Sequence, residues 1–234
     1  MVSLMRTVNL FILYLTVTFT APALAGGVQI GRTRVIYDIN KKEVELALIN
    51  RDREVPWLVQ SWVDNGDGKT RGPFIITPPL FRLDAQKEQS LRITWTGAPL
   101  ADDRESLFYL NVRTIPANEK GSEDKNVLRL IFKTRLKLFF RPAALAGTPA
   151  ETCKNLRFSR SGNQLIIHND GAYYSVFDAL QLGATRLDNF ELVAPKSQAQ
   201  FALPANASGS SISWRCVTDY GNASAAYSAA LQAN

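Results

Sequence analysis

The 234-residue sequence contains a single histidine, His168, and no serine in a G-x-S-x-G turn. It also has no glycine-rich phosphate loop and no dinucleotide-binding fingerprint. A serine nucleophile needs a neighbouring base, and zinc usually takes four ligands, so both kinds of site are disfavoured. We therefore predict a protein without catalytic residues, cofactor or metal, which is not an enzyme. Loss of a measurable activity in a His168→Ala variant would favour a secreted hydrolase instead.

No apolar run in the sequence approaches the roughly twenty residues that a membrane-spanning helix needs. The segment Val8–Phe19 is apolar but shorter, follows a basic N-terminus and precedes the small-x-small site Ala23-Leu24-Ala25. This order is typical of a secretory signal peptide. We expect residues 1–25 to be removed and the mature protein to be exported and soluble.

Cysteine is scarce as well, with Cys153 and Cys216 the only two. In an oxidising compartment an isolated pair forms a disulfide more often than two free thiols, so we predict a bond that staples the C-terminal part. The formal charge of +6 fits a nucleic acid, an anionic membrane or an acidic protein partner. Because no RNA- or DNA-reading motif accompanies it, we do not expect nucleic-acid binding.

Short apolar segments separated by turn signals run through the mature chain, the first of them Val28–Tyr37. This rhythm predicts an all-β fold of two immunoglobulin-like β-sandwich domains, joined at an angle with a cleft between them. The expected boundaries are 26–142 for the first domain, 143–149 for a linker and 150–234 for the second domain. No helix longer than one turn is predicted. At Thr77-Pro78-Pro79 we expect a cis bond or a crossing between sheets.

The segment Asn126–Pro142 is much longer than an ordinary strand of five or six residues. Its apolar residues Leu128, Leu130 and Phe132 alternate with the basic residues Arg129 and Lys133. A strand that is apolar on one side, cationic on the other and too long for its own sheet can offer main chain and side chains to a second protein.

Two basic residues, Arg34 and Lys137, belong to the first and the long predicted strand. If these strands run side by side, both cations face the cleft and can bind a carboxylate through charge-assisted hydrogen bonds. The alternative at this point is that both are solvated surface charges.

Several segments resemble the periplasmic chaperones of the chaperone–usher pilus pathway over essentially the whole mature length. The most specific is Leu100–Pro116, with the sequence LADDRESLFYLNVRTIP. The supporting segments are Gly31-Arg-Thr-Arg34, Thr77-Pro-Pro79 with Arg82-Leu83, Lys137-Leu-Phe-Phe-Arg-Pro142 and Thr218-Asp-Tyr-Gly221. The short loop before the long strand is similar to that of the short-loop branch of the family.

The resemblance implies a periplasmic chaperone that binds pilus subunits, donates a β-strand to complete their fold, prevents their aggregation and delivers them to an outer-membrane usher. It implies that Arg34 and Lys137 anchor the C-terminal carboxylate of a subunit. It implies also that the donated strand inserts apolar side chains into the subunit, and that a buried charge set ties the two domains together. The inserted residues are Leu128, Leu130 and Phe132, and the charge set is Glu105, Arg141 and Asp219.

Strict alternation places Leu128, Leu130 and Phe132 on the face opposite Lys137, which a bulge between them would reconcile. An exposed apolar strand is an aggregation hazard, so we expect the free protein to cap it, a self-capping homodimer being one route. The other class of protein that fits is a secreted two-domain adhesin or receptor module that binds an anionic ligand in the same basic cleft.

Overall fold

The structure is a computed structural model and describes residues 26–117, 128, 130–188, 190–205 and 207–233. The predicted signal peptide, residues 1–25, and Arg129 lie outside the described residues. In the described ranges no helix is long and apolar enough to cross a membrane.

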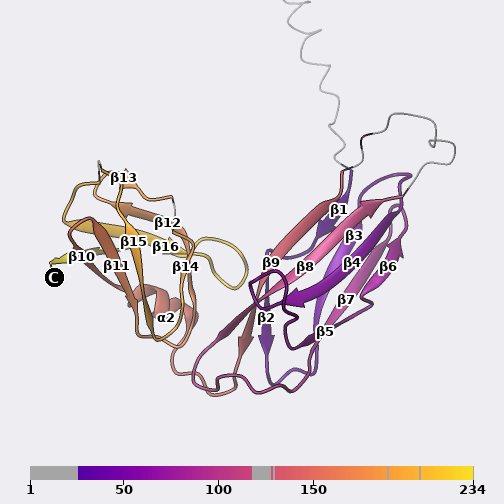
Figure 1. The fold of residues 1–234 in the computed structure, drawn as a ribbon, viewed down its shortest axis with the longest axis horizontal. Helices are drawn as coiled ribbons and strands as arrows, with labels where there is room; N and C mark the ends of the chain where they lie inside the picture. Colours follow the sequence, from indigo (N-terminus) through magenta and orange to yellow (C-terminus); the bar gives the residue numbers. More distant parts are fainter. Residues whose placement is uncertain (1–25, 118–127, 129, 189, 206, 234) are drawn as a thin grey trace, which may run out of the picture.

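The N-terminal domain is a sandwich of two sheets that bury alternate apolar residues against each other (Figure 1). One sheet has the order β1-β3-β7-β5, and the other has the order β2-β9-β8-β4-β6. Fully buried leucines such as Leu46, Leu91, Leu110 and Leu138 come from both sheets, as period-two alternation requires. The strands are β1 (Val28–Ile30), β2 (Arg34–Asp38), β3 (Val44–Asn50), β4 (Trp57–Asp64), β5 (Phe74–Thr77), β6 (Leu80–Leu83), β7 (Glu88–Trp95), β8 (Ser106–Pro116) and β9 (Phe132–Arg141).

In this domain, two short extended segments pass from one sheet to the other part-way along their length. The prediction of a single strand over Val28–Tyr37 is wrong, because β1 pairs antiparallel with β3 whereas β2 pairs parallel with β9 in the other sheet. In the second segment, between β5 and β6, the Thr77–Pro78 bond is cis. The expected cis bond and sheet crossing are therefore confirmed.

Within the strand expected over Asn126–Pro142, β9 covers Phe132–Arg141, and the described residues that precede it, Leu128, Leu130 and Ile131, are not part of the strand. Its two neighbours differ in length, because β8 pairs with Phe132–Phe140 while β2 pairs only with Lys137–Arg141. The register with β8 is continuous, so no bulge lies between Phe132 and Lys137. The bulge considered above is therefore absent, and these two side chains do point to opposite faces.

The C-terminal domain begins with a short helix, α2 (Pro149–Lys154), where no helix longer than a turn was predicted. The residue types at its start favour a helix, because threonine is a good N-cap and proline is common in the first turn. In the structure the Thr148 side chain accepts a hydrogen bond from the Glu151 amide. Two sheets follow, β15-β11-β10-β18 and β13-β12-β16-β17, with β14 paired to β12. The strands are β10 (Arg157–Ser161), β11 (Gln164–Asn169), β12 (Ser175–Leu182), β13 (Thr185–Arg186), β14 (Leu192–Val193), β15 (Ser197–Ala202), β16 (Ser211–Cys216), β17 (Tyr227–Ala230) and β18 (Gln232–Ala233).

A disulfide joins Cys153 on α2 to Cys216 at the end of β16, which confirms the predicted pairing. The bond lies in the core beside Trp214, whose indole N–H donates to the Cys153 carbonyl at 2.8 Å. Trp214 also contacts Phe158, with ring centroids 4.6 Å apart. The helix is thus held to the sandwich by both the disulfide and the hydrogen bond from Trp214.

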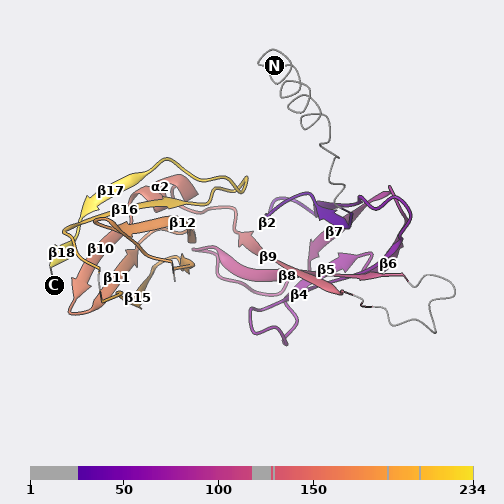
Figure 2. The same ribbon diagram turned by 90° about the horizontal axis from the view of Figure 1, so that it is seen from above.

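The two sandwiches meet at an angle, and β2 and β9 lie on the side of the first domain that faces the second (Figures 1 and 2). This arrangement confirms the predicted fold class, an all-β protein of two immunoglobulin-like domains. Arg34, the first residue of β2, pairs with Lys137 within β9, and these two residues are considered next.

Candidate functional site

Arg34 and Lys137 are direct neighbours across the parallel pairing of β2 and β9. Adjacent strands lie about 4.8 Å apart, and directly paired residues point to the same face of a sheet. The change of sheet after β1 creates this pair, because it brings the start of β2 alongside β9. Two cations therefore stand side by side near the domain junction.

Arg34 reaches from this position into the space between the domains. One of its terminal nitrogens, Nη1, donates to the Val217 carbonyl of the second domain at 3.2 Å, and the guanidinium carbon lies 6.0 Å from the centre of the Phe139 ring. Its Nε is buried and has no hydrogen-bond partner among the described residues. Burial lowers the pKa of Arg34, while the charges of Asp219 and Glu105 act in the opposite direction. Among the described residues, the hydrogen bond of the Arg34 side chain is thus to a main-chain carbonyl and not to a carboxylate.

Lys137 forms an ion pair with Glu191 of the second domain, with Nζ and Oε1 2.5 Å apart. The lysine side chain is only 19 % exposed, whereas that of Glu191 is 69 % exposed. Sequence reasoning missed Glu191, because it lies 54 residues further along the chain and belongs to no motif.

The cleft continues as a cavity of about 320 Å³ between the domains. Arg34 and Phe139 line it from the first domain, and Tyr174 and Val217 line it from the second. The cavity therefore presents a guanidinium beside a largely apolar wall. Within the described ranges, no group of three or more metal-ligating side chains comes together.

The structure brings Glu105, Arg141 and Asp219 together at the junction of the domains. Arg141 Nη2 lies 2.7 Å from Glu105, and its Nη1 lies 2.9 Å from Asp219 of the second domain. Glu105 is 4 % exposed and also accepts a hydrogen bond from the Tyr174 amide at 2.8 Å. Its ionic and hydrogen-bond partners thus come from both domains.

Burial and neighbouring charges shift the pKa values of Glu105 and Arg141. Desolvation raises the pKa of Glu105 above its ordinary value, although Arg141 and the Tyr174 amide oppose that shift. Desolvation alone would lower the pKa of Arg141, but its hydrogen bonds to Asp219 and the charge of Glu105 raise the pKa overall. Buried ion pairs often only offset their desolvation, so these contacts are not in themselves evidence of added stability.

Three further contacts across the junction were not predicted. The Glu105 amide donates to the Ala172 carbonyl at 2.9 Å, and Lys196 Nζ lies 2.7 Å from Asp103. Gly221 approaches Thr33 so closely that a Cβ at this position would overlap the threonine hydroxyl, and its φ of +90° also favours glycine. The glycine of the Thr218–Gly221 segment is therefore required by the close approach of the two domains.

Apolar side chains are exposed where the chain enters β9, at the end of the first domain away from the junction. The exposed fractions are 85 % for Leu128, 56 % for Leu130, 59 % for Ile131 and 52 % for Phe132. Phe132 also contacts Trp57, with ring centroids 6.3 Å apart. Ile131 was not among the predicted residues, because it lies out of step with the alternation.

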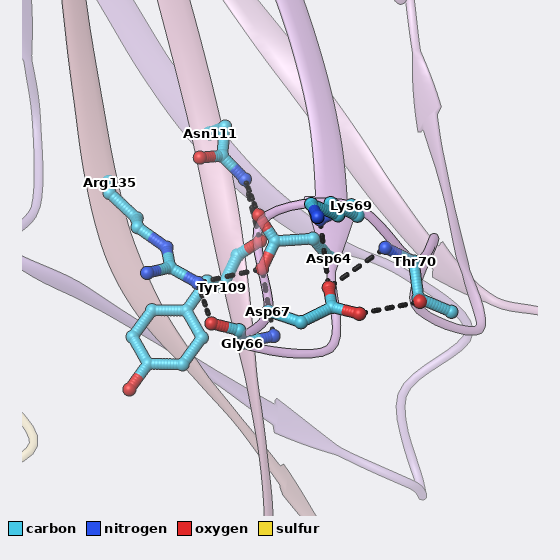
Figure 3. A network of polar contacts seen from close by, with 8 residues as sticks. All are labelled: Asp64, Gly66, Asp67, Lys69, Thr70, Tyr109, Asn111 and Arg135. Carbon is cyan, nitrogen blue, oxygen red and sulfur yellow. Dashed lines mark hydrogen bonds and ion pairs between the residues drawn. The ribbon is translucent and has the colours of Figure 1, made fainter.

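Between this apolar segment and the cleft, Arg135 on β9 is held by the loop that follows β4 (Figure 3). Its Nη2 donates to Asp64 and to the Gly66 carbonyl, both at 2.8 Å, and its guanidinium carbon lies 3.8 Å from the centre of the Tyr109 ring. Burial would raise the pKa of Asp64, but hydrogen bonds from Gly66, Asn111 and Arg135 hold the pKa below its ordinary value. Arg135 thus braces β9, and its charge is already paired.

Fold and site together define a two-domain binding protein that presents an exposed apolar strand segment and a cationic cleft to a polypeptide partner. Two family models together cover most of the chain. Residues 27–146 match "Pili and flagellar-assembly chaperone, PapD N-terminal domain", and residues 151–228 match "Pili assembly chaperone PapD, C-terminal domain". The chain therefore belongs to the family of pilus assembly chaperones.

Individual relatives agree with this assignment. The chain is 41 % identical over 223 residues to the probable fimbrial chaperone SfmC of Escherichia coli K12, covering 95 % of this chain and 96 % of that one. It is 44 % identical over 208 residues to the chaperone FimC of Escherichia coli O6:H1, covering 87 % and 86 % of the two chains.

Solved structures show the same architecture. A chain in the complex of the Salmonella enterica SafA pilin with the SafB chaperone has a TM-score of 0.81 and 33 % identity, with 88 % of this chain and 97 % of that chain covered. The periplasmic chaperone SfaE has a TM-score of 0.76 and 33 % identity, with coverage of 88 % and 100 %. The protein is accordingly a periplasmic chaperone.

Proposed function

We propose that this chaperone binds incomplete pilus subunits, donates β9 to complete their fold and passes them to an outer-membrane usher. The observation that supports the proposal is that an exposed apolar segment leads into β9, while Lys137 of the same strand lies beside Arg34 of β2 at the cleft. A pilus subunit that lacks its last strand leaves an open apolar groove. The relative SafB occurs in complex with a pilin, which supports a pilin-type client for this chain.

The apolar segment supplies the missing core of the client. Leu128, Leu130 and Phe132 are more than half exposed, and Leu128 and Leu130 precede the part of the chain that pairs with β8. Added to the sheet of a client, each side chain that becomes fully buried contributes about 1.5–3 kcal/mol, while the main chain completes the ladder of hydrogen bonds. Three such side chains stabilise a folded client and still permit its later displacement.

The two cations set the register of the added strand. A client carboxylate held by Arg34 and Lys137 fixes the distance between the C-terminus of the client and the apolar segment. Register matters because a slip by one residue turns every side chain to the opposite face. The absence of a bulge poses no difficulty for this account, since the carboxylate lies at the cleft face and the apolar residues enter the client from the other side.

The proposal includes no chemical step. The client is stabilised by strand addition and a held carboxylate, so binding alone accounts for the function, and we propose that the protein is not an enzyme.

The test is co-expression with a pilin-type subunit that lacks its last strand, followed by purification of the complex from the periplasm. Arg34→Ala and Lys137→Ala are each expected to weaken binding about tenfold to a hundredfold, since a hydrogen bond to a charged group contributes about 1.5–3 kcal/mol. Lys87→Ala is the matched control, because Lys87 is an exposed cation of the same domain. Normal recovery of the subunit with both cleft variants would refute the anchor. Capture only of subunits that are already complete would instead favour a receptor module.

A further inference from the structure

The carboxylate of Glu191 lies against one of the two proposed anchor cations. Glu191 Oε1 is 2.5 Å from Lys137 Nζ, and the contact joins the second domain to the first. Since Lys137 is mostly buried and Glu191 mostly exposed, the lysine is the fixed member of the pair and the carboxylate is the member open to replacement.

The main chain at Glu191 is held by its own domain. The preceding residue, Phe190, is buried and packs against Phe201, with ring centroids 4.4 Å apart. The Glu191 carbonyl accepts a hydrogen bond from the Phe177 amide at 3.0 Å, and β14 begins at the next residue. Only the glutamate side chain therefore crosses to the first domain, and it can leave Lys137 without disturbing the sandwich.

The two cations are occupied differently in the free protein. Arg34 donates to a main-chain carbonyl and keeps a buried Nε without a partner among the described residues. Lys137 instead holds a carboxylate, the same chemical group that ends a polypeptide chain. An arriving C-terminus thus meets an arginine that has no carboxylate partner among the described residues and a lysine that already has one.

We propose that Glu191 is a built-in competitor that sets the affinity of the cleft for carboxylates. This inference rests on the proposed function, in which Lys137 and Arg34 bind the client's terminal carboxylate. Because Glu191 is well exposed, its ion pair is weak, and a carboxylate that contacts both cations displaces it. A carboxylate that reaches only Lys137 must compete with Glu191 and binds weakly. A C-terminal carboxylate that contacts both Lys137 and Arg34 binds more tightly.

The experiment is an acetate titration of the purified full-length protein at constant ionic strength, followed by NMR of the Arg34 Nε–H and with acetamide as the uncharged control ligand. Glu191→Gln removes the negative charge and keeps the size of the side chain. Glu45→Gln is the matched control, because it makes the same change of net charge at an exposed position on β3. Lys137→Met and the double variant Glu191→Gln/Lys137→Met complete a double-mutant cycle, which isolates the effect of the Glu191–Lys137 ion pair on acetate affinity.

We expect Glu191→Gln to bind acetate about two- to fivefold more tightly than the unmodified protein, and Glu45→Gln to bind it equally. In proteins that carry Lys137→Met, Glu191→Gln should no longer increase the affinity for acetate. Equal affinities of Glu191→Gln and the unmodified protein, with Lys137→Met weaker, would overturn the competitor while leaving the anchor intact. Acetate binding that is unchanged by Lys137→Met would overturn the anchor itself, and with it the proposed function.

Discussion

The two ends of the β9 segment follow the same alternating pattern and have opposite surroundings. Leu136, Leu138 and Phe140 are buried in the core of the first domain, whereas Leu130 and Phe132 are more than half exposed. The difference lies in the neighbouring strands, because β8 extends along the strand to Phe132 but β2 begins only at Lys137. The same chain segment can therefore contribute to its own core at one end and offer itself to a partner at the other.

The contacts at the buried end of β9 also explain how the strand stays ordered although its other end is apolar and exposed. The buried end of β9 is held by β2 and β8, by Arg135 with Asp64, and by Arg141 with the second domain. These contacts stabilise the strand without any contribution from the exposed end. The exposed end is thus free to be selected for binding, although such an edge invites aggregation unless it is covered.

The largest effect is expected from Leu138→Ala, at the buried end of β9. Leu138 is fully buried, so its truncation removes apolar contacts and leaves a cavity, which lowers the free energy of unfolding by about 2–5 kcal/mol. Urea denaturation followed by tryptophan fluorescence measures the loss. A change below 0.5 kcal/mol would contradict the assignment of this end of the strand to the core.

A smaller effect is expected from Asp64→Asn, which weakens the ion pair between Asp64 and Arg135. Arg135 lies on β9 between its exposed part and its buried part. We expect a loss of about 1–2 kcal/mol in the free energy of unfolding at pH 7, because hydrogen bonds to a charged group are stronger than those to a neutral one. The pKa of Asp64 is lowered in the folded protein, so its contribution is present above the unfolded pKa, near 4, and disappears as the pH falls through the folded pKa. The difference between variant and unmodified protein should therefore narrow in urea denaturation below pH 4. A difference that stays constant across this range would show that the Asp64 charge contributes nothing.

The smallest effect on stability is expected from Leu130→Ala, the counterpart of Leu138→Ala on the exposed segment. Leu130 is 56 % exposed, so the free energy of unfolding should change by less than about 0.5 kcal/mol. Recovery of a subunit lacking its last strand should nevertheless fall, because the client loses a buried leucine. Unfolding curves and subunit recovery measured on the same preparations separate the two consequences. If Leu130→Ala destabilised the free protein as much as Leu138→Ala, the two ends of β9 would not differ in the way described.

Much of the architecture could be predicted from local sequence patterns. Period-two alternation and turn residues predicted an all-β, two-domain chain, and Thr77-Pro78-Pro79 marked a place where the chain changes sheets. The motif resemblance brought Glu105, Arg141 and Asp219 to attention, and the structure places all three at the domain junction. Errors arose where a pattern had a second interpretation. Residues 143–149 were interpreted as a linker from their composition, whereas Thr148 and Glu151 make the capping contacts of α2, which begins at Pro149.

The sequence by itself determined which residues alternate, which segment carries the cations and which cysteines are available to pair, because these depend on residue type and spacing. Only the tertiary structure decided where burial along β9 stops, since that depends on where β2 begins after the chain has changed sheets. It also decided that Glu191 meets Lys137, a contact between residues 54 positions apart that comes from the packing of two domains. Contacts of that kind have no local signal, because neither residue's neighbours in the chain specify its partner.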